Sequence, residues 1–95
     1  MNLRKAVRRL TSPTARCRSH ALVLYGKPGC HLCDDAEALL GRLKRRHQFS
    51  LDKVDITSDP ALFRQYDIRI PVIVVDGQHE IDAPIGEEEL RRLLR

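Results

Sequence analysis

The sequence has no tryptophan and no long apolar run, and it contains only three cysteines among its 95 residues. A membrane-spanning helix needs about 18 or more consecutive apolar residues, so no stable membrane insertion is expected. No apolar signal-peptide segment is visible, and export is therefore not expected. Three cysteines are too few, and odd in number, for a secreted disulfide framework. A reducing compartment fits this cysteine usage better, so we expect a cytoplasmic protein.

Acidic residues are missing from the first 20 positions, which carry six lysines and arginines. Residues 21–95 carry the remaining 11 basic residues and all 13 acidic ones, so this part of the chain is slightly acidic. The formal net charge of +4 therefore belongs to the N-terminal segment. A basic patch on the body is the usual footprint of nucleic-acid binding, so no nucleic-acid partner is expected.

The basic N-terminal segment, residues 1–19, has apolar residues at helical spacing, namely Leu3, Ala6, Val7 and Leu10. Ser12-Pro13 interrupts the pattern, and about ten residues are too few for a stable isolated helix. The main expectation is a flexible, solvated extension. The alternatives are an Arg-rich transit presequence that would direct the chain to an organellar matrix, a membrane-surface anchor, and an extra helix docked on the body.

Residues 20–95 have the length of one domain, and their apolar residues alternate between strand and helix spacing. Asp76-Gly77 is a strong two-residue hairpin signal, and a right-handed crossover makes the first two strands parallel. The expected fold is α/β, with the order βαβαββα, a four-stranded mixed sheet and helices on both faces. The predicted strands are 21–26, 50–56, 72–75 and 78–81, and the predicted helices are 31–46, 60–66 and 87–95.

Cys30 and Cys33 are separated by two residues and lie where the first predicted strand ends and the first helix begins. The unpaired N–H groups and the macrodipole of a helix start stabilise an anion. A thiolate there is the nucleophile of disulfide exchange, and a thiol three positions later can close the product disulfide. Cys30 is the predicted nucleophile and Cys33, one turn into the helix, the resolving thiol. The alternative is a pair of buried structural cysteines.

A zinc site is a rival interpretation, because Cys17 and His20 together with the cysteine pair supply four suitable ligands. The five apolar residues between the two halves would extend about 16 Å as a strand. Zinc ligands lie about 2.0–2.3 Å from the metal, so ligands at opposite ends of one strand cannot share it. We therefore expect no metal and no bound cofactor.

The stretch Tyr-Gly-Lys-Pro-Gly-Cys-X-X-Cys, followed by Val-Asp-Ile, Ile-Pro-Val and an Asp-Gly hairpin, resembles glutaredoxin-like members of the thioredoxin-fold superfamily. The resemblance is closest to small bacterial glutaredoxin family proteins with a Cys-His-Leu-Cys centre, and it spans about residues 21–95. It implies a thioredoxin-like fold and a thiol–disulfide oxidoreductase that reduces protein or glutathione mixed disulfides. We expect this protein to be a monomer.

Four further residues are candidates for substrate binding. The charge of Lys27 would favour the Cys30 thiolate, and the resemblance implies that Lys27 also meets a glutathione carboxylate; the alternative is a solvated loop lysine. His31 would share in the electrostatics or be an exposed spacer. Local chemistry favours a trans Ile70–Pro71 bond, since about 5–6% of such bonds are cis. The resemblance instead implies a cis bond facing the cysteines, with the Ile70 backbone pairing with the substrate.

One departure from the family pattern concerns glutathione. Glutaredoxins that bind glutathione well have a Gly-Gly and Asp segment after the hairpin, whereas residues 80–87 read Glu-Ile-Asp-Ala-Pro-Ile-Gly-Glu. Arg69, Asp82 and Glu87 are candidates for an altered rim of the site. Glutathione is thus one candidate co-substrate, and a dithiol protein reduced by a thioredoxin-reductase-type donor is the first alternative. The second is a non-catalytic thioredoxin-fold binding module.

Overall fold

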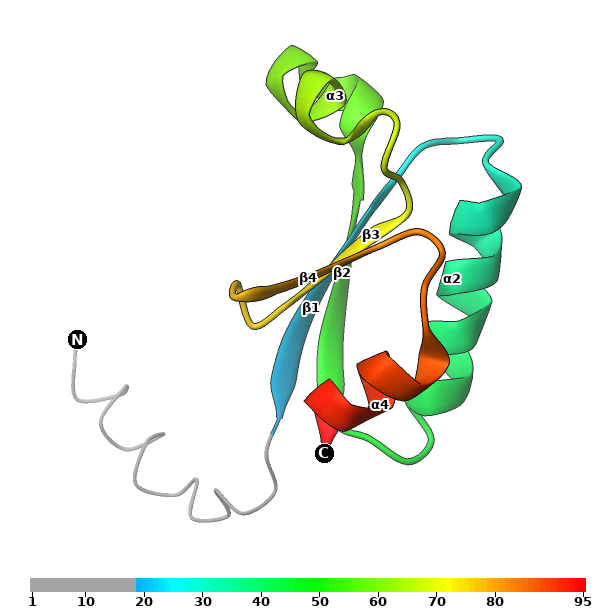
Figure 1. The fold of residues 1–95 in the computed structure, drawn as a ribbon, viewed down its shortest axis with the longest axis vertical. Coiled ribbons are helices and arrows are strands. Elements are labelled where there is room, and N and C mark those ends of the chain that lie inside the picture. The colour runs from blue at the N-terminus through cyan, green and yellow to red at the C-terminus, as the bar shows by residue number, and fades with distance from the viewer. Residues whose placement is uncertain (1–18) are drawn as a thin grey trace, which may run out of the picture.

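The computed structural model describes residues 19–95, which form a four-stranded sheet with helices on both of its faces (Figure 1). The order of elements is the predicted βαβαββα, with one additional 3-10 turn after the second strand. The bounds are β1 His20–Gly26, α2 His31–Leu43, β2 Phe49–Asp55, η2 Ile56–Ser58, α3 Pro60–Tyr66, β3 Val72–Val75, β4 His79–Asp82 and α4 Glu87–Leu94.

The strands lie in the order β2-β1-β3-β4. β1 pairs with β2 in parallel, as the crossover through α2 requires. β3 is antiparallel to β1 and β4, and the mixed sheet is thereby confirmed. Asp76 and Gly77 connect β3 to β4 with φ angles of 55° and 68°. Positive φ at both central residues is the geometry of the type I′ hairpin turn that Asp-Gly favours.

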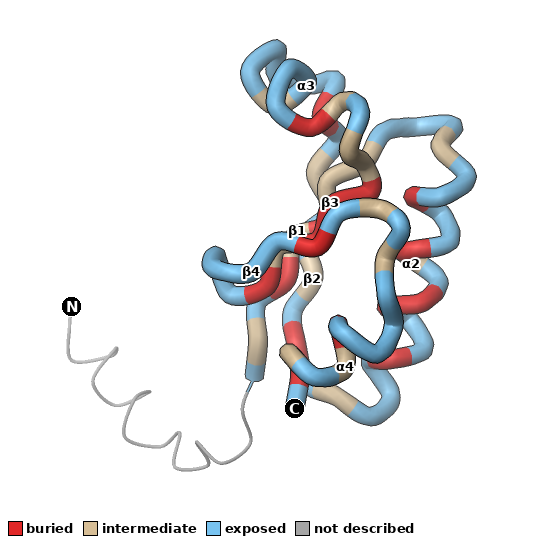
Figure 2. Tube along the Cα trace, in the orientation of Figure 1, coloured by how far each residue is buried: buried red, intermediate tan, exposed pale blue. Residues whose placement is uncertain are grey.

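The alternation of side chains along β1 and β3 divides the core into two clusters. Leu22 and Leu24 of β1 and Ile73 of β3 face α2 and α4, and they belong to the larger cluster. Val72, on the opposite face, packs with Ile56 and Tyr66 of η2 and α3 in the smaller cluster. Figure 2 shows the buried positions of α2 along one side of the helix. Helices therefore cover both faces of the sheet, as predicted.

The helix α2 ends at Leu43 rather than at residue 46 as predicted. The backbone N–H groups of Arg45 and Arg46 donate to the carbonyls three residues earlier, those of Arg42 and Leu43. This is the 3-10 pattern, so the last predicted turn is not α-helical. The Lys44 Nζ atom donates to the carbonyl of Phe49, which holds this turn against the start of β2. The other boundaries differ from prediction by about one residue, which is the usual uncertainty of element ends.

The N-terminal predictions lie outside the described residues, and these include the basic extension, its alternatives and Cys17. β1 begins at His20, the first residue of the predicted domain. Among the helices of residues 19–95, none has the length and apolar character needed to cross a bilayer.

Candidate functional site

Cys30 is the N-cap residue of α2, with an extended backbone at φ −97° and ψ 112°. Its Sγ atom accepts a hydrogen bond of 3.2 Å from the N–H of Cys33. Gly29, just before it, has φ 79°, a conformation that glycine adopts at no steric cost. The sulfur therefore lies at the helix terminus, where unpaired N–H groups and the macrodipole favour negative charge. The predicted placement of Cys30 at a helix start is confirmed.

Cys33 lies one turn into α2 and is buried, with 7% of its surface exposed. Burial is the largest cause that raises the pKa of the Cys33 thiol from 9.0 to about 11, and the hydrogen bond with Cys30 raises it further. A backbone hydrogen bond with Lys27 opposes this rise. At neutral pH the Cys33 sulfur is therefore a protonated thiol behind a half-buried Cys30. The two sulfurs thus differ in exposure, as a pair with different chemical roles would require.

Gly26, the last residue of β1, packs directly against Cys33 of α2. A Cβ atom built on Gly26 would lie 2.9 Å from the Cys33 Sγ and 3.1 Å from its Cβ. Real Cβ atoms essentially never lie within 3.0 Å of a non-bonded heavy atom, so only glycine leaves room for this thiol. The sequence analysis did not identify Gly26. A glycine at a strand end is a weak signal of such a close approach.

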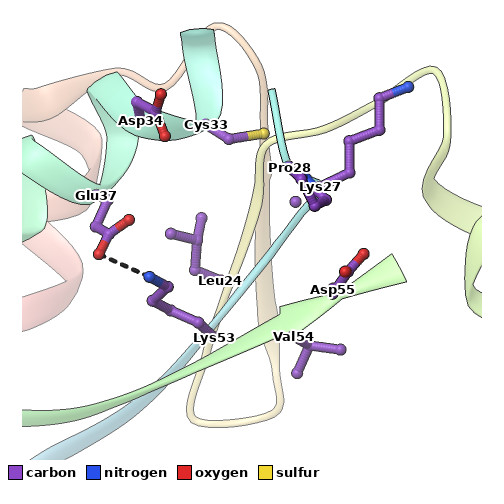
Figure 3. A pocket seen from close by; sticks show the side chains of 10 residues that line it. Leu24, Lys27, Pro28, Cys33, Asp34, Glu37, Lys53, Val54 and Asp55 are labelled. Carbon is purple, nitrogen blue, oxygen red and sulfur yellow. Dashed lines mark hydrogen bonds and ion pairs between the residues drawn. The ribbon is translucent and has the colours of Figure 1, made fainter. Parts of the chain in front are cut away.

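Cys33 also lines a cavity of about 300 Å³ below the start of α2 (Figure 3). Leu24 forms part of its apolar wall. An ion pair joins Glu37 of α2 to Lys53 of β2 across the cavity, with 2.8 Å between Oε2 and Nζ. The buried thiol thus borders a space that contains charged groups of both signs.

Lys27 and His31 flank Cys30 in the sequence, but within residues 19–95 of the structure neither side chain makes a hydrogen bond or ion pair with a cysteine. The Lys27 ammonium lies 3.8 Å from the Asp67 carboxylate, and Figure 3 shows the side chain directed away from Cys33. His31 is the first residue of α2 and is exposed. The predicted roles of both residues stay predictions.

The peptide bond between Ile70 and Pro71 is cis, as the family resemblance implied. Pro71 is buried, and Ile70 is half-buried. The Ile70 N–H donates to the Tyr66 carbonyl at 3.1 Å. The Ile70 carbonyl accepts no hydrogen bond from the described part of the chain, and its pairing with a substrate stays a prediction.

Arg69 connects the segment before Pro71 to β4. Its guanidinium donates to Asp82 at 2.9 and 3.0 Å and to Glu80 at 2.6 Å. It also lies 5.1 Å from the ring centre of Tyr66, within the range of a cation–π contact. The Arg69 guanidinium holds the pKa of the Asp82 carboxyl below its usual value. Arg69 and Asp82 therefore bind each other, and Glu80 and Tyr66 are further partners of Arg69 that were not predicted from the sequence.

His20 lies at the opposite end of β1 from the cysteines. Its Nδ1 atom is 2.6 Å from an Asp76 carboxylate oxygen, which ties the start of β1 to the hairpin turn. Within residues 19–95, no three His, Cys, Asp or Glu side chains are grouped as a metal site would need. Of the four proposed zinc ligands, Cys17 lies outside the described residues.

The sequence of the domain that carries this site also matches a known protein family. Residues 21–95 match the family model described as "Glutaredoxin-like domain (DUF836)". The chain belongs to this glutaredoxin-like family. The family resemblance of the cysteine motif, the proline and the hairpin is thereby confirmed, and it supports a redox function.

Solved structures resemble this glutaredoxin-like domain over most of its length. The X-ray structure of target protein XcR50 from X. campestris is 36% identical, covers 77% of this chain and 93% of its own, and has a TM-score of 0.63. The solution structure of protein Ne2328 from Nitrosomonas europaea is 29% identical, with coverages of 80% and 92% and a TM-score of 0.71. A mutant thioredoxin from Halobacterium salinarum NRC-1 is 23% identical, with coverages of 90% and 79% and a TM-score of 0.63, and it shows the thioredoxin-like fold.

In this glutaredoxin-like domain, the segment between β4 and α4 reads Ala-Pro-Ile-Gly and has no paired glycines. Ala83–Pro84 is a second cis peptide bond, which the sequence analysis did not predict. Glu87, at the start of α4, lies 3.9 Å from Arg42 and 3.7 Å from Arg91. Of the three residues predicted for the rim, Arg69 and Asp82 therefore pair with each other, whereas Glu87 pairs with arginines. Their common role at a rim stays a prediction.

Proposed function

We propose that this protein is a thiol–disulfide oxidoreductase that reduces protein or glutathione mixed disulfides through Cys30 and Cys33. The observation that carries the proposal is the Cys30 sulfur at the N-cap of α2, which accepts the Cys33 N–H while Cys33 is buried behind it. Together with membership of the glutaredoxin-like family, this arrangement favours catalysis over a pair of structural cysteines.

The proposed reaction has two exchange steps. The Cys30 thiolate attacks one sulfur of the substrate disulfide, so that an S–S bond to Cys30 forms and the first substrate thiolate leaves. Cys33 then loses its proton to solvent and attacks the Cys30 sulfur, which releases the second substrate thiolate. Two electrons have passed to the substrate, and the protein holds a Cys30–Cys33 disulfide. A thiol donor must reduce that disulfide before the next cycle.

The donor is either glutathione or a thioredoxin-reductase-type protein. The segment after β4, with Glu87 paired to arginines, differs from the paired glycines of glutathione-binding glutaredoxins. This difference favours a reductase as donor. A coupled assay supplied in turn with glutathione and with thioredoxin reductase distinguishes the two. The proposal further includes a cytoplasmic or organellar-matrix monomer with no bound cofactor.

Single-cysteine variants test the division of roles. Cys33→Ser should accumulate a covalent adduct with a disulfide substrate, because the resolving thiol is missing. Cys30→Ser should form at least about tenfold less adduct, since a buried, protonated thiol is a poor nucleophile. Intact-mass measurement detects both adducts.

Cys17→Ser serves as the control and should behave as the unmodified protein. Equal trapping by Cys33→Ser and Cys30→Ser would contradict the proposed roles. An inactive Cys17→Ser variant would instead favour the zinc interpretation.

A further inference from the structure

A groove begins beside the cysteine motif and runs between α2 and the segment that joins β4 to α4. Its volume is about 300 Å³. Leu32, which stands between the two cysteines in the sequence, lines the groove although 57% of its surface is exposed. The other apolar lining residues include Leu39, Pro71, Pro84 and Ile85. An apolar surface thus extends from the reacting sulfur's own helix turn past the cis-proline.

The charges around this groove have an excess of carboxylates. Asp35 lies on its rim, and within residues 19–95 it has no ion-pair partner within 4.0 Å. Arg42 is the cation among the lining residues, and it lies 3.9 Å from Glu87, which lines the same groove. Among the described residues that line the groove, the one cation therefore already has an acidic neighbour.

Glutathione matches this surface poorly. It carries two carboxylates and one amine, so its recognition depends on cations in the site. Arg42 is already beside Glu87. Lys27 lines the cavity beside Cys33 and not this groove, and it lies 3.8 Å from Asp67. A ligand with carboxylates would have to compete with Glu87 for Arg42 and approach Asp35, whereas a cationic ligand would not.

We propose that the groove binds the polypeptide around a substrate cysteine, taking an apolar side chain while Asp35 attracts basic residues next to it. The preferred substrates are therefore disulfides of proteins with an apolar and basic cysteine segment. This inference rests on the proposed disulfide exchange at Cys30. Alternate residues of an extended peptide point to the same side about 7 Å apart, so the apolar side chain belongs two positions from the reacting cysteine.

The test uses the full chain carrying Cys33→Ser, in which the reaction stops after the first exchange step. The substrates are peptide disulfides of equal length. Each peptide carries one cysteine in disulfide linkage to the same chromogenic aryl thiol. One peptide has leucine two positions from cysteine and flanking arginines, the second replaces leucine by serine, and the third replaces the arginines by glutamates. The small neutral bis(2-hydroxyethyl) disulfide reports on Cys30 itself. The measurement is the second-order rate constant, from aryl thiolate absorbance for the peptides and from intact mass for the neutral disulfide.

The leucine–arginine peptide should react at least about tenfold faster than the glutamate peptide at low salt, because complementary charge raises association rates. The advantage should shrink at high ionic strength, where the screening length falls to about 3 Å at 1 M. Asp35→Lys should lower the arginine-to-glutamate rate ratio about fivefold. Leu32→Ser should lower the leucine-to-serine ratio about threefold. Asp52→Lys, an exposed position on the far edge strand β2, should change neither ratio.

Two results would overturn the inference in distinguishable ways. If the neutral disulfide reacts while the three peptides react at equal rates, the groove does not select substrates and the proposed function stands. If neither the neutral disulfide nor any peptide reacts, the proposed function fails, and this inference fails with it. Ratios rather than absolute rates are compared, because a change at Asp35 also alters the electrostatics of Cys30.

Discussion

The two cysteines lie only three positions apart in the sequence, but their different places in the structure make them chemically different. Cys30 caps α2 and is half-buried, while Cys33 is buried one turn later. Desolvation disfavours the thiolate of Cys33 and raises its pKa. Attack by Cys33 therefore requires a proton to leave first, and this requirement predicts a pH dependence for the second exchange step.

The rate at which Cys33 resolves a Cys30 mixed disulfide should rise about tenfold per pH unit between pH 7 and 9. The reacting species is the thiolate, and the pKa of about 11 leaves little of it at neutral pH. In the mixed disulfide Cys30 carries no charge, so its own contribution to the shift is lost, but burial remains. Rapid-quench mass spectrometry of the preformed mixed disulfide measures this rate. A rate that is constant from pH 7 to 9 would mean that Cys33 is already ionised.

Gly26→Ala should destabilise the protein by about 1–3 kcal/mol, the usual cost of adding a methyl group to a packed site. The new Cβ would lie 2.9 Å from the Cys33 Sγ, so the sulfur or the start of α2 must move. Resolution by Cys33 should become slower as well. Urea unfolding and the resolution rate measure the two effects.

Gly41→Ala is the matched control, since a Cβ there meets no atom within 4 Å. Gly41 lies within α2, where alanine is favoured over glycine by about 1 kcal/mol. This variant should be as stable as the original protein or more stable, with an unchanged resolution rate. Equal behaviour of the two variants would show that Gly26 does not position Cys33.

At the scale of elements, the hairpin of β3 and β4 is joined to β1 through its turn. The Asp76 carboxylate accepts the Ala21 N–H at 2.8 Å and lies 2.6 Å from the His20 Nδ1. The Asp76 N–H donates to the Ala21 carbonyl at 2.7 Å. One residue of the turn thus continues the contact between β1 and β3 beyond the last ladder pair, Leu22 with Val75.

Asp76→Ala should lower the free energy of unfolding by about 1–2 kcal/mol. The Ala21 N–H and His20 lose their acceptor. The loss of stability is small because 37% of the Asp76 side chain is exposed to solvent. Alanine also suits the φ of 55° poorly. Chemical unfolding at pH 7 measures the loss. Asp76→Asn, which keeps an acceptor oxygen and tolerates this φ, should lose less.

The contribution of Asp76 should also depend on pH in a defined direction. Its hydrogen bonds with His20 and then Ala21 lower the pKa of the carboxyl below 3.8. The stabilisation is therefore complete above about pH 4 and is lost as the pH falls through the lower folded-state pKa. The difference in stability between the original protein and Asp76→Asn should shrink in that acid range. A difference that is constant down to about pH 2 would contradict this assignment.

At the scale of the whole molecule, both core clusters and all four strands lie within residues 19–95. Removal of residues 1–19 should therefore leave the thermal midpoint and the exchange rates nearly unchanged. Leu40→Ala is a positive control for the measurement, since Leu40 is fully buried and its loss should cost about 2–5 kcal/mol. A large fall in the midpoint of the shortened chain would show that the N-terminal segment stabilises the body.

The sequence by itself determined the order of elements, the placement of Cys30 at a helix start and the Asp-Gly turn. These features depend on residues close together in the chain: apolar spacing, an N-cap and a turn dipeptide. The cis bond before Pro71 required the family resemblance, because local chemistry favours trans. The end of α2 was predicted wrongly because the basic residues after Leu43 form a tighter, non-α-helical turn.

Only the tertiary structure decided which distant residues meet. Arg69 binds β4, Gly26 admits Cys33, and Glu37 pairs with Lys53. The apolar groove likewise joins the first turns of α2 to the segment before α4, which is far away in the sequence. Such contacts follow from strand order, register and helix packing, and the pattern of a single segment contains none of these. Local patterns therefore predicted where the reactive pair lies, while packing decided the burial, the neighbours and the surface that surround it.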